Sequence, residues 1–147
     1  MTKNGFTILE LVATLVIIGL LVGIGTPVYL SHVKEARVTE AKLNMDRILL
    51  QMKSNLTRYG YMGVGETVSG SEQQFSCTKA DLESRLGMTL PQEIKLRWNI
   101  SVDIEYSFID GILHMTGLIE FTGTSALPFH GNIKVIFNVA TLQFTVE

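Results

Sequence analysis

Cysteine is nearly absent from this chain of 147 residues, in which Cys77 is the only one. A single cysteine excludes a disulfide between two positions of the sequence. Two alternatives remain for the thiol: a link to another chain in an oxidising compartment, or a small buried side chain. We favour the buried side chain.

The sequence also lacks the residue patterns of common active sites and metal sites. It has no nucleophile elbow, and its histidines are far apart, without the spacing of metal ligands. The carboxylates of Asp103 and Glu105 are close in sequence, but they fall on the water-exposed face of a predicted strand. We therefore expect no enzyme activity, no catalytic residue, no metal ion and no cofactor. The histidines are His32, His114 and His130.

A basic surface of the kind that binds nucleic acid is missing from the second half of the chain. Residues 76–147 contain five bases against eight acids, whereas residues 32–60 contain six bases against three acids. Because phosphate binding requires a basic stripe, we expect no nucleic-acid partner. The opposite charges of these regions indicate either a contact between neighbouring copies or two merely solvated faces, and we favour the solvated faces.

Acidic and basic residues are absent from one long stretch near the amino end. The 23 residues from Leu11 to Val33 contain none, and as a helix they span about 35 Å, enough to cross a bilayer core of about 30 Å. Glu10 lies at the start of this stretch. A carboxylate at the bilayer centre costs about 2.5 to 3.5 kcal/mol, and less near the ends. Glu10 is thus either at the headgroup level of an ordinary anchor or a functional charge that needs a partner.

A leader of five residues, Met-Thr-Lys-Asn-Gly, precedes Phe6 and carries one positive charge. The apolar stretch after it is longer than the hydrophobic region of a secretory signal, which is about 7 to 15 residues, and no small-x-small site follows. We therefore expect no ordinary signal peptidase site.

The segment GFTILELVATLVIIGLLVGIGTPVYL resembles the amino-terminal segment of type IV pilins and type II secretion pseudopilins. The shared features lie in one register: the Gly5-Phe6 junction, the lone Glu10, an Ile-Ile-Gly step, and a proline followed two residues later by a tyrosine. Ile8-Leu9 reverses the commoner order, but both residues are apolar. The resemblance covers 26 of the 147 residues, and its motif is specific.

This resemblance implies that a dedicated prepilin peptidase cleaves between Gly5 and Phe6 and methylates the new amine of Phe6. The apolar helix then stays in the mature protein. It also implies that Glu10 pairs with the Phe6 amine of a neighbouring subunit during assembly; such a pair specifies register. Many pilins close their carboxy-terminal region with a disulfide, which a single Cys77 does not allow, so strand pairing has to hold that region.

The helix is expected to continue beyond the apolar stretch and to end at Tyr59, because Gly60 gives a natural stop. Apolar residues recur there at intervals of three and four, which is the pattern of an amphipathic helix that lies on a sheet. The stripe consists of Val33, Ala36 or Arg37, Ala41, Met45, Ile48, Leu49, Met52, Leu56 and Tyr59.

Four residues predict a flexible stretch inside this long helix. Pro27 removes a backbone hydrogen bond, and Gly19, Gly23 and Gly25 lower helix propensity, so the stretch is expected to bend or open locally. The resemblance implies that the same stretch unwinds in assembled pili.

The rest of the chain predicts a sheet. Residues 60–76 are rich in glycine and polar residues, which is typical of a long loop, and a short helix is expected over 79–86. Strict alternation from Leu96 to Phe108 predicts a strand with one buried face, and Asp110-Gly111 predicts a tight hairpin to a returning strand. Two further strands are expected, within residues 133–139 and 142–146.

We therefore predict an α+β fold: a long amino-terminal α-helical stem, transmembrane in its first half and amphipathic in its second, packed on a carboxy-terminal antiparallel sheet of about four strands. The predicted parts are the cleaved leader 1–5, the transmembrane and assembly half of the stem 6–30, the amphipathic half 31–59, the connecting loop with a short helix 60–94, and the sheet 95–147.

The predicted function is that of a structural subunit, a pilin, which polymerises into a type IV pilus-like surface fibre. The alternative is a pseudopilin of a type II secretion system. A membrane-anchored sensor or enzyme with a β-rich head would need neither Gly-Phe cleavage nor a charge at Glu10. Expected partners are other pilins in a helical filament, the prepilin peptidase, the inner-membrane assembly machinery, and the membrane before assembly. The precursor is expected in the bacterial inner membrane and the mature chain in an extracellular fibre at the cell surface.

Overall fold

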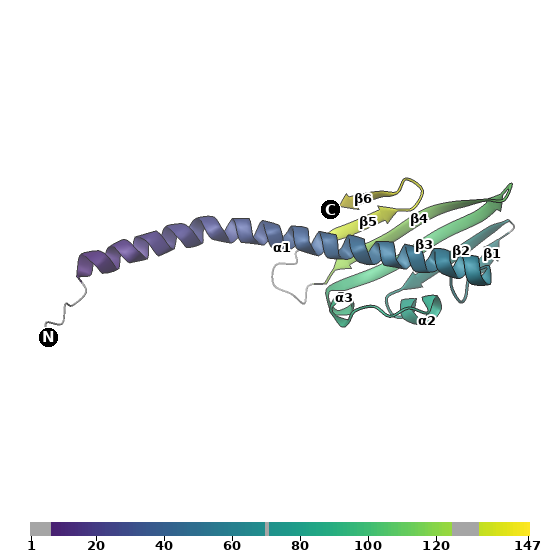
Figure 1. The fold of residues 1–147 in the computed structure, drawn as a ribbon, viewed down its shortest axis with the longest axis horizontal. Helices are drawn as coiled ribbons and strands as arrows, with labels where there is room; N and C mark the ends of the chain where they lie inside the picture. The colour runs from purple at the N-terminus through teal and green to yellow at the C-terminus, as the bar shows by residue number, and fades with distance from the viewer. Residues whose placement is uncertain (1–6, 70, 125–132) are drawn as a thin grey trace. The chain divides into compact units, whose positions relative to one another are not determined.

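A long helix, α1 (Ile8–Tyr59), begins the fold, and a sheet with two short helices follows it (Figure 1). The chain forms two compact units, Met1–Ala36 and Arg37–Glu147, and we call the second unit the head. The α1 helix starts in the first unit and ends in the head. The computed structural model describes residues 7–69, 71–124 and 133–147.

Within the head, α1 buries the apolar stripe that the sequence predicts. Tyr59, its last predicted member, is an exception with 62% exposure, because it ends the helix and stacks on Tyr61 instead. The predicted helix end is confirmed: Gly60 follows with φ of 80°, a conformation that glycine adopts without strain. The buried apolar residues of α1 are Ala41, Met45, Ile48, Leu49, Met52 and Leu56.

In the described part of the chain, six antiparallel strands form one sheet, and each strand pairs with its neighbour in sequence. The α+β class is confirmed, and the predicted number of four strands is wrong. The two extra strands, β1 and β2, lie mainly in the predicted loop 60–76. Only Phe75 and Cys77 of β2 point into the core, too few for a visible alternation. The strands are β1 (Thr67–Ser69), β2 (Glu72–Thr78), β3 (Trp98–Ile109), β4 (Ile112–Gly123), β5 (Lys134–Asn138) and β6 (Gln143–Val146).

The predicted hairpin between β3 and β4 is confirmed. Asp110 and Gly111 both have positive φ, 52° and 77°, which is the geometry of a two-residue type I′ turn. The strand begins later than predicted, however, because Leu96 belongs to the short helix α3 (Gln92–Arg97) and is 63% exposed. The even-numbered residues from Trp98 to Tyr106 are buried, as the alternation requires.

The other short helix, α2 (Leu82–Leu86), is three residues shorter at its start than the predicted helix 79–86. The Oδ1 atom of Asp81 accepts hydrogen bonds from the backbone N–H and the hydroxyl of Thr78, at 2.8 and 2.9 Å. These bonds hold residues 78–81 in a turn, so the helix begins after Asp81. Gly87 ends it with φ of 67°, as predicted.

The core lies between α1 and one face of the sheet. Trp98 and Phe121 contact each other there with ring centroids 6.0 Å apart, and Phe137 and Phe144 do so at 4.6 Å. Burying one large apolar side chain contributes about 1.5 to 3 kcal/mol, so this layer supplies most of the stability of the head. Cys77 is 3% exposed, which confirms the buried alternative for the thiol.

Arg85 of α2 ties the segment after α1 to the sheet. Its guanidinium donates to the carbonyls of Val64 and Gly65, both at 2.6 Å, and to the carbonyl of Ser76 on β2. The same group lies 4.8 Å from the ring centroid of Phe75. One side chain therefore joins α2, the α1–β1 connection and the part of β2 that extends beyond its pairing with β1.

Glu66 organises the same connection from the other side. Its carboxylate accepts hydrogen bonds from the backbone N–H groups of Met62 and Gly63 and from the hydroxyl of Tyr106, the last at 2.7 Å. Burial, followed by this bond to Glu66, raises the pKa of Tyr106 above its usual range. Asn55 of α1 donates to the carbonyl of Met62 at 3.0 Å, so the connection is also fixed to the helix.

Acidification is expected to destabilise the head through Asp81 and Glu83. The hydrogen bonds from Thr78 lower the pKa of Asp81, and those from the Leu90 N–H and Lys95 lower the pKa of Glu83. A lowered pKa in the folded state contributes stability above the unfolded pKa and loses it as the pH falls through the folded pKa. The melting temperature should therefore drop between about pH 5 and pH 3.

This pH dependence is checked by thermal unfolding across that range, monitored by circular dichroism. Glu83→Gln should show a smaller acid-induced drop than the original chain. Glu105→Gln is the matched control, because Glu105 accepts no hydrogen bond among the described residues. Equal drops in all three chains would contradict the assignment to Glu83.

Candidate assembly site

Glu10 lies in the first turn of α1, where its carboxylate forms a capping box with Thr7. Its Oε2 atom accepts hydrogen bonds from the backbone N–H and the hydroxyl of Thr7, both at 3.1 Å. The backbone N–H of Glu10 donates in return to Thr7 Oγ1 at 3.3 Å. In this motif, side chains satisfy N–H groups that a helix start leaves without partners. Thr7 and Glu10 therefore fix where the helix begins.

The capping box gives Glu10 a partner that the sequence analysis missed. The signal was present, because Thr7 and Glu10 have the Thr-x-x-Glu spacing of this motif. The carboxylate also lies at the positive end of the helix dipole, which is favourable by about 0.3 to 1 kcal/mol. No cation forms an ion pair with it among the described residues. The predicted processing residues, Gly5 and Phe6, lie outside the described residues.

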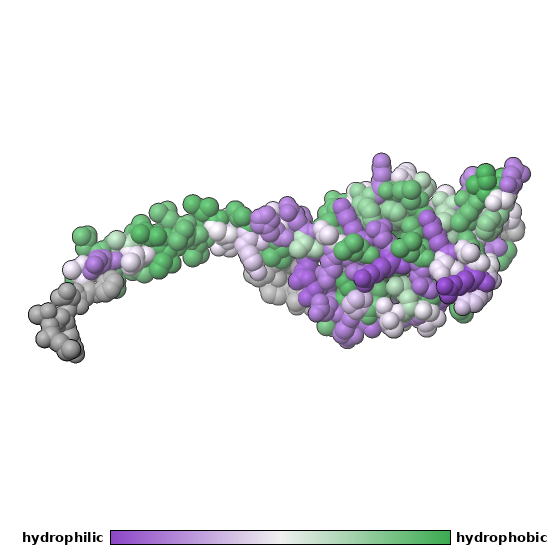
Figure 2. Space-filling model, in the orientation of Figure 1, coloured by the Kyte–Doolittle hydropathy of each residue, from purple (hydrophilic) through white to green (hydrophobic). Residues whose placement is uncertain are grey.

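The first part of α1 presents an apolar surface that nothing in its own compact unit covers. Every residue from Thr7 to Tyr29 is exposed, and the large apolar side chains among them are 50% to 84% exposed. Figure 2 shows this part of the helix as mostly hydrophobic. The helix is long and apolar enough to cross a membrane. Exposure of such a surface to water is unfavourable, so we expect lipid or other apolar helices to cover it.

The predicted flexible residues lie within an uninterrupted helix. Gly19, Gly23 and Gly25 have no atoms within 4 Å of the place where a Cβ would lie, so no packing in this chain requires them. Small residues on an exposed helix allow another helix to approach closely. Pro27 lacks an N–H, which removes one bond from the helix. Local opening at these residues during assembly stays a prediction.

Replacing Thr7 with valine tests the capping box. Valine keeps the shape of threonine but lacks the hydroxyl, so the first turn of α1 should lose about 1 kcal/mol. Hydrogen exchange in detergent micelles should then accelerate about fivefold at the amides of Glu10 and Leu11, which bond to Thr7, with residues 41–56 unchanged. Thr14→Val is the control, since its hydroxyl bonds only to the Leu11 carbonyl inside the helix. Equal exchange in both variants would rule out the cap.

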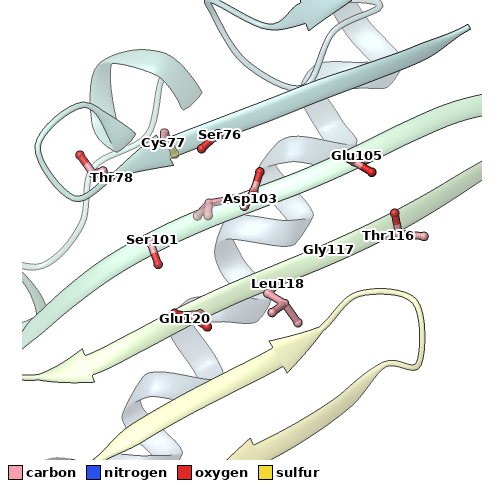
Figure 3. A pocket seen from close by; sticks show the side chains of 11 residues that line it. Ser76, Cys77, Thr78, Ser101, Asp103, Glu105, Thr116, Gly117, Leu118 and Glu120 are labelled. Carbon is pink, nitrogen blue, oxygen red and sulfur yellow. The ribbon is translucent and has the colours of Figure 1, made fainter. Parts of the chain in front are cut away.

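The head carries a second feature, an open hollow of about 620 Å³ over the sheet face that is turned away from α1. Figure 3 shows Asp103, Glu105 and Glu120 on this face, around Leu118, with the helix behind the sheet. The neighbouring side chains are mainly hydroxyls, such as that of Thr116. Asp103 accepts a hydrogen bond from Gln74 at 3.2 Å, and Glu120 pairs with Lys134 at 3.1 Å.

Neither feature carries the groups of a catalytic centre. In the described part of the chain, no three His, Cys, Asp or Glu side chains are arranged to hold a metal ion. Burial raises the pKa of the Cys77 thiol to about 12, so the thiol is not a ready nucleophile at neutral pH. The exposed first part of α1, in which Glu10 is the only carboxylate within residues 7–29, is therefore the candidate site. No protein-family model, no curated protein and no solved structure matches this chain.

Proposed function

We propose that this protein is a structural subunit, a pilin, that polymerises into a type IV pilus-like surface fibre through the apolar half of α1. The observation that carries the proposal is the exposed apolar first part of α1, residues 7–29, with one carboxylate in its first turn. The sequence motif around Gly5 and Phe6 supports it. Before assembly the membrane covers this helix, and in the fibre the helices of other copies cover it.

The proposed role of Glu10 follows from the electrostatics of an apolar environment. Cleavage before Phe6 creates a terminal amine, which stays positively charged when it carries one methyl group. An unpaired charge buried among apolar helices is strongly penalised, by about 3 to 5 kcal/mol, whereas a matched pair is tolerated. A subunit that enters the fibre out of register leaves both charges unpaired, so the pair between Glu10 and the neighbouring amine selects the correct register.

The capping box gives Glu10 a neutral partner before assembly. In the membrane-bound subunit, hydrogen bonds from Thr7 partly satisfy the carboxylate. A carboxylate oxygen has room for more than one donor, so the neighbouring amine adds to this arrangement without dismantling it. The helix therefore presents the charge in a defined position when the next subunit arrives.

Mass spectrometry of the purified mature chain tests the proposal. We expect a chain that starts at Phe6 and carries one added methyl group. An intact Met1 would contradict the proposal and favour a membrane-anchored sensor or enzyme. Imaging of cells with and without the protein separates the two fibre classes, because a pilin requires surface filaments and a secretion pseudopilin does not.

A further inference from the structure

The part of α1 in the head has an outward face that the fold does not use. Leu43 and Leu50 are 59% and 66% exposed and lie seven residues apart, about 10 Å along one side of the helix. Their neighbours Met45 and Ile48, on the other side, are fully buried in the core. Neither leucine contributes to the core of the head, so both remain available for a contact with another chain.

The bases on this face have no partners in the described part of the chain. Arg47 and Arg58 lie on the same side of the helix as the two leucines, and Lys53 and Asp46 lie at its edge. The side chains of the two arginines and of Lys53 form no ion pair or hydrogen bond among the described residues. Several other bases of the head do form ion pairs: Arg37, Arg85, Lys95, Arg97 and Lys134.

The sheet carries the complementary charge on the opposite side of the head. The outer face of the sheet presents Asp103, Glu105 and Glu120 around Leu118, which is 38% exposed (Figure 3). Only Glu120 of these carboxylates has a cationic partner among the described residues, Lys134. This face is therefore negative with an apolar centre, and the helix face is positive with an apolar centre.

The two faces also match in size. Arg47 and Arg58 are eleven residues apart on the helix, about 16 Å. On the sheet, Glu120 of β4 lies opposite Ser101 of β3, which is four residues before Glu105. The two glutamates are therefore about 13 Å apart along the strands and about 5 Å across them. Leu50 lies between the two arginines, and Leu118, paired with Asp103, lies between the two glutamates.

We propose that the outward face of α1 in one head, Leu43, Arg47, Leu50 and Arg58, docks on the outer sheet face of a second copy, around Asp103, Glu105 and Leu118. The charge complementarity of the two faces favours a second copy of this chain over an unrelated partner. Because the faces are different and lie on opposite sides of the head, the contact is heterologous. Such a contact gives a closed ring or an open helical filament, and the proposed fibre requires the open form. The inference rests on the proposed function, since it places this contact in the fibre.

Disulfide cross-linking tests the contact directly. Filaments are assembled from two chains of different mass, one with Leu50→Cys and one with Leu118→Cys, and then oxidised. The native Cys77 is buried and does not interfere. We expect at least ten times more cross-linked heterodimer than from the control pair Leu50→Cys and Ile112→Cys, since Ile112 is 63% exposed but lies at the hairpin end of β4, six residues or about 20 Å along the strand from Leu118. Equal yields from both pairs would overturn the inference.

Charge reversal gives an independent measurement. Filament yield should fall at least fivefold for R47E/R58E and for D103K/E105K, and the chain with all four substitutions should return to within twofold of the original. Thermal unfolding verifies that each head is folded. A folded two-residue variant that assembles normally, or a folded four-residue variant that does not recover, would overturn the inference. Where a variant does not fold, the cross-linking result decides.

Failure of this inference is distinguishable from failure of the proposed function. If the unmodified chain keeps Met1 and forms no filament, the proposed function fails. If it forms filaments that depend on Glu10 but gives no specific cross-link between positions 50 and 118, only the docking of the two head faces fails.

Discussion

Replacing Glu10 with alanine is expected to leave cleavage before Phe6 intact and to abolish filaments. In the proposed fibre, the substitution leaves each neighbouring Phe6 amine buried without its counter-charge, which costs about 3 to 5 kcal/mol per subunit. That penalty lowers the association constant for each added subunit by about two to three and a half orders of magnitude. The measurements are mass spectrometry of the chain and sedimentation or imaging of filaments.

The glutamine variant separates the charge of Glu10 from its role as a cap. Glu10→Gln keeps a carbonyl oxygen that accepts the bonds from Thr7 but has no charge. Like the alanine variant, it should therefore form no filaments. Thr7→Val keeps the charge of Glu10 and should form filaments. Normal filaments from Glu10→Gln would refute the ion pair and leave Glu10 as a helix cap only.

Replacing Arg85 with methionine should lower the stability of the head more than any other surface charge substitution discussed above. Methionine fills similar space but loses the bonds to the carbonyls of Val64, Gly65 and Ser76 and the contact with Phe75. Because bonds to a charged donor are worth about 1.5 to 3 kcal/mol and these carbonyls regain water, we expect a net loss of about 2 to 3 kcal/mol.

The loss at Arg85 is measured by chemical and thermal unfolding of the mature chain in detergent. For a domain the size of the head, the melting temperature should fall by about 10 °C. Arg58→Met is the matched control: Arg58 has no hydrogen bond or ion pair among the described residues, so its unfolding should be unchanged. A shift below about 2 °C for Arg85→Met would show that the guanidinium bonds are offset by solvation.

The parts of the fold that the sequence predicted are those whose signals are local and repeated. The buried face of α1 repeats over several turns, so each residue supports the next. The β3–β4 hairpin combines a long alternation with Asp110-Gly111, a dipeptide that accepts positive φ at both positions. In both cases the chain itself, more than its surroundings, determines the structure.

The parts that escaped prediction depend on contacts distant in sequence. The β2 strand pairs with β3 from Gln73–Tyr106 to Thr78–Ser101, and the side chains of Arg85 and Glu66 hold the segment beside it. Leu96 continues the alternation of β3 in sequence, yet the helix α3 takes it, because a helical turn after Pro91 precedes the strand. Tertiary contacts therefore determine where such short strands and helices form.

The candidate site, too, has features that were predictable from the sequence and features that were not. The apolar run with Glu10 was visible in the sequence. The capping box was also visible in the spacing of Thr7 and Glu10, but we interpreted that carboxylate only as a headgroup-level charge or as a charge that needs a partner on another chain. The two exposed faces of the head could not be predicted. Alternation and helical periodicity indicate which residues are exposed, but they do not indicate which exposed side chains lack an ion pair or a hydrogen bond. Cleavage, methylation and assembly stay predictions.

The consecutive order of the six strands has a consequence for how the head forms. Each strand pairs with the one just before it in the chain, so no crossover has to wait for a distant segment. Short loops close quickly, and folding speed rises as contacts become more local. The sheet of the head can therefore form strand by strand in the order of the chain, from β1 to the four residues of β6.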